Sequence, residues 1–256
     1  MLNMAVNLDS VSKRFGEIRA VNALSLEIAE GTVYGLLGPN GSGKSTTMKL
    51  IMGLLKPDSG RITVCGMDPQ KEPLNVKRVI GYVPETPRLY EFLTGMEYLD
   101  FIAAIHGIPT EQYMPKVNRF LKAFELSGHE NKMIGGYSNG MKQKTAIIGA
   151  LLGDPELLVL DEPLGGLDSK SARIMKDLLH TIAEEGVTTI FSTHVLEIAE
   201  AICDKICILY KGNLLTEGTA EELKRLSDTP DSTLEEAFLK LTNSSDVREI
   251  VEALAY

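Results

Sequence analysis

The stretch "TVYGLLGPNGSGKST", Thr32 to Thr46, decides the fold class of this chain. Its first half is almost continuously apolar, as is typical of a strand that is buried on both faces of a parallel sheet. Its second half, "GPNGSGKS", fits the pattern G-x-x-x-x-G-K-[ST] and runs into "TMKLIMGLL", which has helical character. A buried strand, a glycine-rich turn and a helix in this order predict a phosphate-binding loop, or P-loop, in an α/β core.

The residue types of the P-loop match the chemistry of phosphate binding. Glycines let successive backbone N–H groups converge on phosphate oxygens, and the following helix adds its positive dipole end. Lys44 is expected to reach the β- and γ-phosphates, and Ser45 to offer its hydroxyl to Mg²⁺. A chance glycine-rich turn is the alternative, but the correct flanks on both sides argue against it. The predicted nucleotide contacts are Gly38, Pro39, Asn40, Gly41, Ser42, Gly43, Lys44, Ser45 and Thr46.

Strand and helix patterns alternate on both sides of the P-loop. Ala23 to Ile28 alternates apolar and polar residues, which favours a half-buried strand, and Arg61 to Gly66 and Val79 to Glu85 follow as further strands. After a helical stretch, strand patterns return in "ELLVLDEP", "VTTIFSTH" and "KICILYKG", with helices between them. This order predicts an α/β fold of the P-loop NTPase type, with a mostly parallel sheet and an N-terminal antiparallel β subdomain.

The long stretch between the strand patterns is helical throughout. Its segments "TGMEYLDFIAAIHGI", "EQYMPKVNRFLKAFEL" and "MKQKTAIIGALLG" have helical character, with no convincing strand between them. We therefore expect a helical lobe inserted into the α/β core, and a helical tail after the last strand. The predicted boundaries are 1–86 and 154–220 for the core, 87–153 for the lobe and 221–256 for the tail.

Two features of the predicted helices are specific enough to check. The helix from Ser169 to Gly186 carries Ile174, Leu178 and Ile182 on one stripe, which is expected to face the core. Capping boxes are expected to open short helices near the end of the chain. These boxes pair Thr219 with Glu222 and Ser232 with Glu235.

Composition excludes several classes of protein. The 256 residues are 44% hydrophobic and 24% charged, as in an ordinary globular protein, and the net charge of -9 argues against a nucleic-acid partner. Cys65, Cys203 and Cys207 form no disulfide framework, and no further Cys or His completes a zinc set, so core packing is expected. The sequence has neither a signal-peptide pattern nor an apolar run of about 18 residues. We expect a cytoplasmic chain that reaches a membrane only through a partner.

Two acidic residues follow the apolar strand in "LLVLDEP". Four apolar residues place Asp161 at the carboxyl end of the sheet, where ligands of open α/β sheets bind. Asp161 suits the Mg²⁺ shell, through water. Glu162 is the candidate to orient or deprotonate the attacking water, because it lies near the γ-phosphate without being a metal ligand. A solvated acidic strand end is the alternative, and the P-loop upstream favours the functional interpretation.

His194 closes the strand "TTIFSTH". A lone histidine at a strand end is usually structural. Here we expect its strand to neighbour the strand of Asp161, so its end opens onto the same site. This placement favours a contact between His194 and the γ-phosphate.

Five motifs follow one another along the chain, with a helical insert between them: the P-loop, "YSNGM", "LLVLDEP", "GGLD" and His194. In this order they resemble the ATPase subunit of an ABC transporter over nearly the whole chain. The resemblance implies that "YSNGM" is the signature loop, and that two subunits pair head to tail with this loop closing over the partner's ATP. It also implies that Asp168 belongs to the interface loop after the acidic pair, and that Phe15 stacks on adenine, with Val21 flanking the base. The implied signature residues are Ser138, Asn139, Gly140 and Met141, and Ser138 is expected to cap the helix that begins at Met141.

The sequence departs from the family's pattern at two site positions. Glu85 stands where the family usually has glutamine, and a glutamate there is expected to bind Mg²⁺ and to add negative charge near the phosphates. Asn139 replaces the first glycine of the signature, and we expect this turn to survive because asparagine tolerates a positive φ. Lys142 and Lys144, further along, are expected on a solvated helix face.

The stretches "VPETPRLYEFLTGMEYL" and, more loosely, "TLEEAFLKLT" resemble a subgroup of exporter ATPases whose membrane partner is a separate chain. The resemblance thus implies ATP and Mg²⁺ as cofactors, a second ATPase subunit and integral membrane subunits as partners, and a place on the inner face of the cell membrane. The alternatives are a soluble ABC ATPase of cofactor assembly, and a GTPase or small-molecule kinase. The guanine-reading motif N-K-x-D is absent, since "NKMI" at Asn131 lacks the aspartate.

Overall fold

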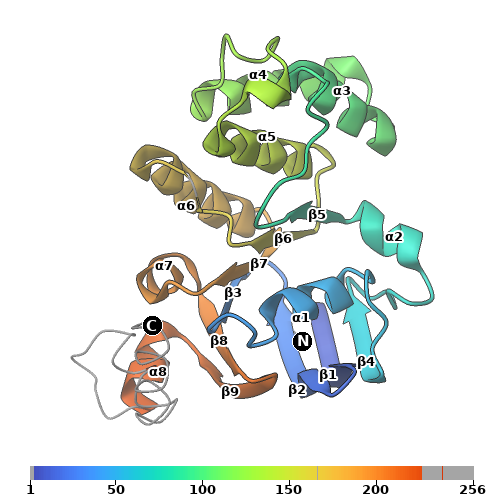
Figure 1. The fold of residues 1–256 in the computed structure, drawn as a ribbon, viewed down its shortest axis with the longest axis vertical. Helices are drawn as coiled ribbons and strands as arrows, with labels where there is room; N and C mark the ends of the chain where they lie inside the picture. Colours follow the sequence, from blue (N-terminus) through green and yellow to red (C-terminus); the bar gives the residue numbers. More distant parts are fainter. Residues whose placement is uncertain (1–2, 166, 227–237, 239–256) are drawn as a thin grey trace.

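The structure is a computed structural model that describes residues 3–165, 167–226 and 238. Its centre is a six-stranded sheet in the order β5-β6-β7-β3-β8-β9, in which every pairing is parallel except that of β9 with β8 (Figure 1). The strands are β3 (Val33–Leu37), β5 (Ile80–Val83), β6 (Leu157–Asp161), β7 (Thr188–Thr193), β8 (Lys205–Tyr210) and β9 (Asn213–Gly218). The predicted α/β class with a mostly parallel sheet is confirmed.

Continuous apolar runs explain two strands in the middle of this sheet, β3 and β6. All residues of β3, β6 and β7 are buried, because helices or the second sheet cover both faces. The edge strand β9 alternates exposed and partly buried residues, and its pattern was too polar to be anticipated from sequence. The strand order puts the carboxyl ends of three neighbouring parallel strands, β6, β7 and β3, side by side, and they form one edge of the sheet, which we call its carboxyl edge.

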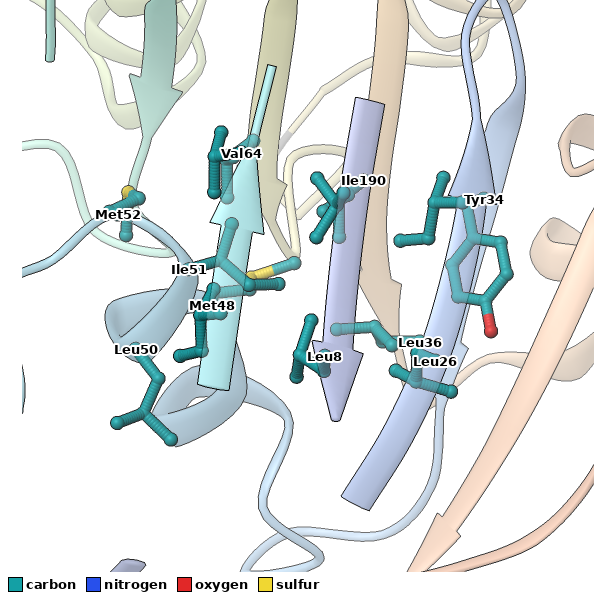
Figure 2. Packing of buried hydrophobic residues seen from close by; sticks show 14 of the residues in the cluster. Leu8, Leu26, Tyr34, Leu36, Met48, Leu50, Ile51, Met52, Val64 and Ile190 are labelled. Carbon is teal, nitrogen blue, oxygen red and sulfur yellow. The ribbon is translucent and has the colours of Figure 1, made fainter. Parts of the chain in front are cut away.

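A second, three-stranded sheet forms the predicted antiparallel subdomain. It consists of β1 (Met4–Phe15), β2 (Ile18–Ala29) and β4 (Ser59–Val64), in the order β2-β1-β4. The helix α1 (Lys44–Ile51), which begins directly after the P-loop, shares one buried cluster with both sheets. Figure 2 shows Met48 and Ile51 of α1 in this cluster together with Leu8 and Val64 of the antiparallel sheet and Ile190 of the central sheet.

Three helices of 12 to 14 residues lie together at one end of the molecule, away from the antiparallel sheet (Figure 1). They are α3 (Gly95–His106), α4 (Thr110–Ala123) and α5 (Asn139–Leu152), and we call residues 95–152 the helical segment. The short η1 (Ile134–Gly136) precedes α5, which is buried over most of its length. The segment lies between β5 and β6 in the chain, while the division into core, lobe and tail stays a prediction.

The remaining helices are α2 (Pro73–Arg78), α6 (Ser169–Glu184), α7 (Leu196–Ile202) and α8 (Ala220–Leu226), of which α2 was not anticipated. The stripe predicted for α6 does face the core: Ile182 is buried in it, and Ile174 and Leu178 are partly buried and pack against it. The neighbouring Met175 and Leu179, which were not predicted, are buried more deeply. The capping box of Thr219 and Glu222 at α8 is confirmed, with both bonds present. Ser232 and Glu235 lie outside the described residues.

Within the part of the chain described, no helix combines the length and hydropathy needed to cross a membrane.

The cysteines pack as expected from the sequence. Cys207 is fully buried in the core around β3, and burial raises the pKa of the Cys203 thiol to about 12. A Cβ on Gly35 would lie 2.8 Å from the sulfur of Cys203, so this close approach of β3 to the end of α7 requires glycine. Both thiols therefore serve packing.

Candidate active site

The P-loop runs from the end of β3 to the first residue of α1. Gly43 occupies the N-cap of α1 with a φ of 109°, and a Cβ there would lie 2.5 Å from the backbone oxygen of Ala20. At Gly38 a Cβ would lie 2.2 Å from the backbone oxygen of Leu209. Only glycine fits at these two positions, which is why the loop can curl against β2 and β8. Its tip, at Asn40 and Gly41, is exposed.

Lys44 folds back onto its own loop. Its side chain is 6% exposed, and Nζ donates to the backbone oxygens of Gly38, at 2.6 Å, and Pro39, at 3.3 Å. Burial lowers the pKa of Lys44, while the carboxylates of Glu162, Asp161 and Glu85 act to raise it. The predicted acidic residues therefore lie around this ammonium group. Ser45 and Thr46, in the first turn of α1, are partly exposed.

Asp161 ends β6 and is itself 6% exposed. Ser192, its register partner on β7, donates from Oγ to Asp161 Oδ1 at 2.5 Å. Sequence reasoning missed Ser192. Its signal was a small polar residue near the carboxyl end of a strand that was expected to neighbour the strand of the acidic pair. The hydroxyl fixes the orientation of the Asp161 carboxylate.

Glu162 has a backbone φ of 48°, in the left-handed region that non-glycine residues rarely adopt. Its N–H donates to Ser192, to the backbone oxygen at 3.2 Å and to Oγ at 3.0 Å. Its Oε1 lies 2.8 Å from Nδ1 of His194. Because β6 and β7 are neighbours, as expected, the two predicted catalytic side chains are in direct contact. Backbone strain of this kind collects at functional sites, where surrounding contacts hold it.

A cavity of about 310 Å³ adjoins the glutamate–histidine pair. Its walls include Glu85, Glu162 and His194, joined by Asn139 and Gln143 of α5. The structure thus brings the loop after β5, the end of β6 and the beginning of α5 together. Gln143, a polar residue on an apolar helix face, was not anticipated as part of this site.

The signature loop differs from expectation in two ways. Ser138 caps α5 as predicted and accepts from the backbone N–H of Met141 at 3.2 Å, but the helix already begins at Asn139. Neither Asn139 nor Gly140 has a positive φ, so the expected need for left-handed tolerance at position 139 was wrong. A first helical turn accepts asparagine without strain. The loop remains at the surface, with Ser138 and Asn139 exposed.

The solvated face expected for two lysines of α5 was also wrong. Lys144 is 8% exposed and its Nζ lies 3.2 Å from Oδ2 of Asp168. Lys142 pairs with Glu91 at 2.5 Å. The physical reason is that α5 is covered on most of its surface, so its polar residues must find protein partners.

Asp168 caps α6. Its carboxylate accepts from the N–H of Ser171 at 2.9 Å and from the Ser171 hydroxyl at 2.8 Å. These bonds, with the nearby Lys144 ammonium, hold the pKa of Asp168 well below its usual range. Asp168 thus lies between the beginning of α6 and the first turns of α5.

The two residues predicted to contact the base have opposite environments. Phe15 is 48% exposed at the end of β1, with Nζ of Lys13 lying 5.7 Å from its ring centroid. Val21 is 1% exposed and packs in the core around α1, so it offers no surface to a base, and its predicted role is corrected. The exposed apolar residue opposite Phe15 is Ile18.

The oxygen donors at this edge suit Mg²⁺. Ser45 offers a partly exposed hydroxyl, and Asp161 and Glu85 offer carboxylates around Lys44. Across the described ranges no three His, Cys, Asp or Glu side chains form a preformed metal cage. Mg²⁺ typically binds through one or two carboxylates together with substrate phosphates and water, so this sparse donor set fits it.

Comparison with known proteins agrees with this geometry. The family model described as "ABC transporter" matches residues 21–165. The daunorubicin resistance ATP-binding protein DrrA3 of Streptomyces coeruleorubidus is 35% identical over 224 residues, which cover 88% of this chain and 71% of that protein.

Two solved structures are similar as well. One is an ATP-binding subunit of an ABC transporter, with a TM-score of 0.89 and 31% identity over 94% of this chain and 100% of the other. The other is a dimeric ATP-binding cassette in a post-hydrolysis state with ADP and phosphate, with a TM-score of 0.74 and 28% identity over 84% of this chain and 98% of the other.

Proposed function

The chain belongs to the ABC transporter family, and from this premise we propose how its residues divide the work of ATP-driven transport. It is an ATP-binding subunit whose ATP hydrolysis is coupled to transport. The GTPase and kinase alternatives are thereby excluded. The observation that carries the assignment of roles is the meeting of Lys44, Asp161, Glu162 and His194 at one edge of the sheet.

Hydrolysis at this edge depends on position and charge. Lys44 moves from its loop carbonyls to the β- and γ-phosphates, because phosphate oxygens are the stronger acceptors. Glu162 orients the attacking water and receives its proton, and His194 holds the Glu162 carboxylate and contacts the γ-phosphate. Ser45, Asp161 and Glu85 would hold Mg²⁺, which neutralises phosphate charge when bound. Phosphoryl transfer in such sites rests on positioning and electrostatic stabilisation.

We propose that a second ATPase subunit completes each site. Ser138 and Asn139 are exposed at the N-terminal end of α5, where free N–H groups attract an anion. Phe15 is exposed and free to stack on adenine on the core side. The dimeric state of the similar cassette with ADP and phosphate supports a pair of subunits. In the proposed pair the subunits meet head to tail, and the signature loop of each closes over the partner's ATP.

An integral membrane subunit, as a separate chain, is the proposed second partner. Tyr90, Phe92 and Phe101 form an exposed aromatic cluster on the helical segment and the loop before it, with ring centroids 5.7 and 5.5 Å apart. Exposed apolar clusters of this kind mark protein interaction sites. Docking there would place the subunit on the inner face of the cell membrane. The resistance function in the name of DrrA3 favours export.

A mixing experiment tests the head-to-tail pair. Lys44→Ala disables one chain's P-loop, and Gly140→Asp places a carboxylate before the partner's phosphates while suiting the first turn of a helix. Each variant alone should hydrolyse no ATP. Random pairing gives mixed dimers with one intact site, so the mixture should recover up to about a quarter of the wild-type rate. A mixture no more active than its parts contradicts completion in trans.

A further inference from the structure

The segment that follows Glu162 is attached to the helical segment of the same chain. The buried Gln143 donates from Nε2 to the backbone oxygen of Pro163 at 3.1 Å, and Lys144 donates to Asp168 at 3.2 Å. A third link joins Lys170 at the beginning of α6 to Glu125. All three links end on residues 163–170, directly after the proposed catalytic glutamate.

Glu162 is therefore held from two sides. On the core side its backbone N–H is bonded to Ser192, and its carboxylate contacts His194. On the helical side the next residue, Pro163, is bonded to Gln143, whose side chain is 2% exposed. The left-handed φ of 48° at Glu162 makes this double attachment necessary, because a strained backbone persists only where its surroundings fix it.

The signature loop lies at the N-terminal end of the same helix, α5. Ser138 caps α5, and Lys144 follows six positions later, which is about 9 Å along a helix. Lys142, between them, is tied to Glu91 beside the helical segment and not to the loop after Glu162. Two adjacent residues, Gln143 and Lys144, thus join the beginning of a rigid helix to the segment that follows Glu162.

We propose that Gln143 and Lys144 are positioning residues that couple the two ATP sites of the dimer. This inference rests on the proposed head-to-tail pair. The partner's ATP fixes the position of the beginning of α5. Gln143 and Lys144 transmit this position to Pro163 and Asp168. Through them it reaches Glu162 of the chain's own site. Each catalytic glutamate then reaches its most active position when the signature loop of the same chain is engaged, so the single intact site of the Lys44 and Gly140 mixed dimer should be active but slower than a wild-type site.

The coupling predicts a separation of catalysis from binding. Neither residue lies in the P-loop, so Gln143→Met and Lys144→Met should leave the ATP dissociation constant within about threefold of wild type. A displacement of about 1 Å at a catalytic group can lower a rate about 100-fold, so kcat should fall by about 10- to 100-fold. Lys144→Arg keeps a cation that can reach Asp168 and should restore most of the rate.

The test measures kcat, ATP affinity and dimer content on the full-length chain. Lys116→Met is the matched control: its amine bonds the backbone oxygen of Leu151 at the far end of α5, and its loss should leave kcat within about twofold. With Glu162 intact, Lys144→Met and Gln143→Met should accumulate ATP-bound dimer in light scattering, because closure is preserved and hydrolysis is slow. A folding defect would instead lower dimer content and ATP affinity together.

Two outcomes overturn the coupling. One is a wild-type kcat in both methionine variants. The other is a parallel loss of ATP binding and hydrolysis, or no rescue by Lys144→Arg, which would make the contacts merely structural. If Gln143→Met fails to fold, Lys144→Met with its arginine rescue decides alone. If the mixture of the Lys44 and Gly140 variants recovers activity alongside either outcome, the proposed function stands and only the coupling is contradicted. If the mixture does not recover activity, both the head-to-tail pair and the coupling are contradicted.

Discussion

Lys44 shows how burial prepares a residue for its ligand. Its ammonium group is bonded to two backbone oxygens of its own loop and lies among acidic side chains, so its charge is compensated while no phosphate is bound. We expect phosphate oxygens, which are the stronger acceptors, to replace these carbonyls when ATP binds.

Lys44→Ala should lower ATP affinity at least about 100-fold, because it removes bonds to charged oxygens that contribute about 1.5–3 kcal/mol each. Titration with a fluorescent ATP analogue measures the effect. Lys49→Ala, an exposed lysine at the other end of α1, is the control and should bind normally. Unchanged binding by Lys44→Ala would remove the P-loop assignment.

Glu85 acts on the same charge balance, since its carboxylate acts to raise the pKa of Lys44. Glu85→Gln restores the neutral residue usual in the family and removes one acidic Mg²⁺ donor. We expect the Mg²⁺ concentration for half-maximal ATPase to rise severalfold and the ATP consumed per substrate transported to change. An unaltered Mg²⁺ dependence and coupling ratio would mean that the carboxylate has no special role in this loop.

At the scale of elements, the beginning of α5 combines a structural cap with a binding surface. The Ser138 hydroxyl is used within the chain, on the N–H of Met141. The other free N–H groups of the first turn remain for an anion. A cap and a phosphate site can share one helix end because they use different donors.

Ser138→Ala separates these two roles. Loss of an N-cap costs about 1 kcal/mol of stability, and the same loss is expected for Thr94→Ala at the capping box of α3. Both variants should lower the melting temperature by similar amounts, measured by calorimetry, but only Ser138→Ala should lower kcat. Equal ATPase in the two variants would confine Ser138 to a structural role.

Helices and strands could be predicted from the sequence where the local residue pattern agrees with the burial that the structure shows. The continuous apolar runs of β3 and β6 and the glycine spacing of the P-loop predicted strand, turn and helix correctly. The errors at Val21 and Lys144 have another origin: which face of an element is covered depends on packing that no local pattern records. Ser192 and Gln143 were missed for the same reason, since their roles come from neighbours that lie 31 and 20 positions away in the chain.

At the scale of the whole molecule, the central sheet brings the P-loop, the acidic pair and His194 to one edge, while α5 holds the signature loop at the molecular surface. The order of motifs predicted this class of arrangement through its resemblance to ABC ATPases. The direct contacts between α5 and the loop after Glu162 depend on tertiary structure alone. A chain that exposes both the tip of its P-loop and its signature loop is suited to act in pairs.

The most direct test of this account is the behaviour of Glu162→Gln in ATP. Glutamine keeps the shape of the side chain and its contact with His194 but cannot take a proton, so hydrolysis should fall by about 100- to 10,000-fold while ATP binding persists. Size-exclusion chromatography with light scattering should then show a stable dimer in ATP and a monomer in ADP. The double variant Lys44→Ala/Glu162→Gln should stay monomeric in both nucleotides. Hydrolysis at the wild-type rate, or a monomer in saturating ATP, would contradict a glutamate-driven ATPase that works as a head-to-tail pair.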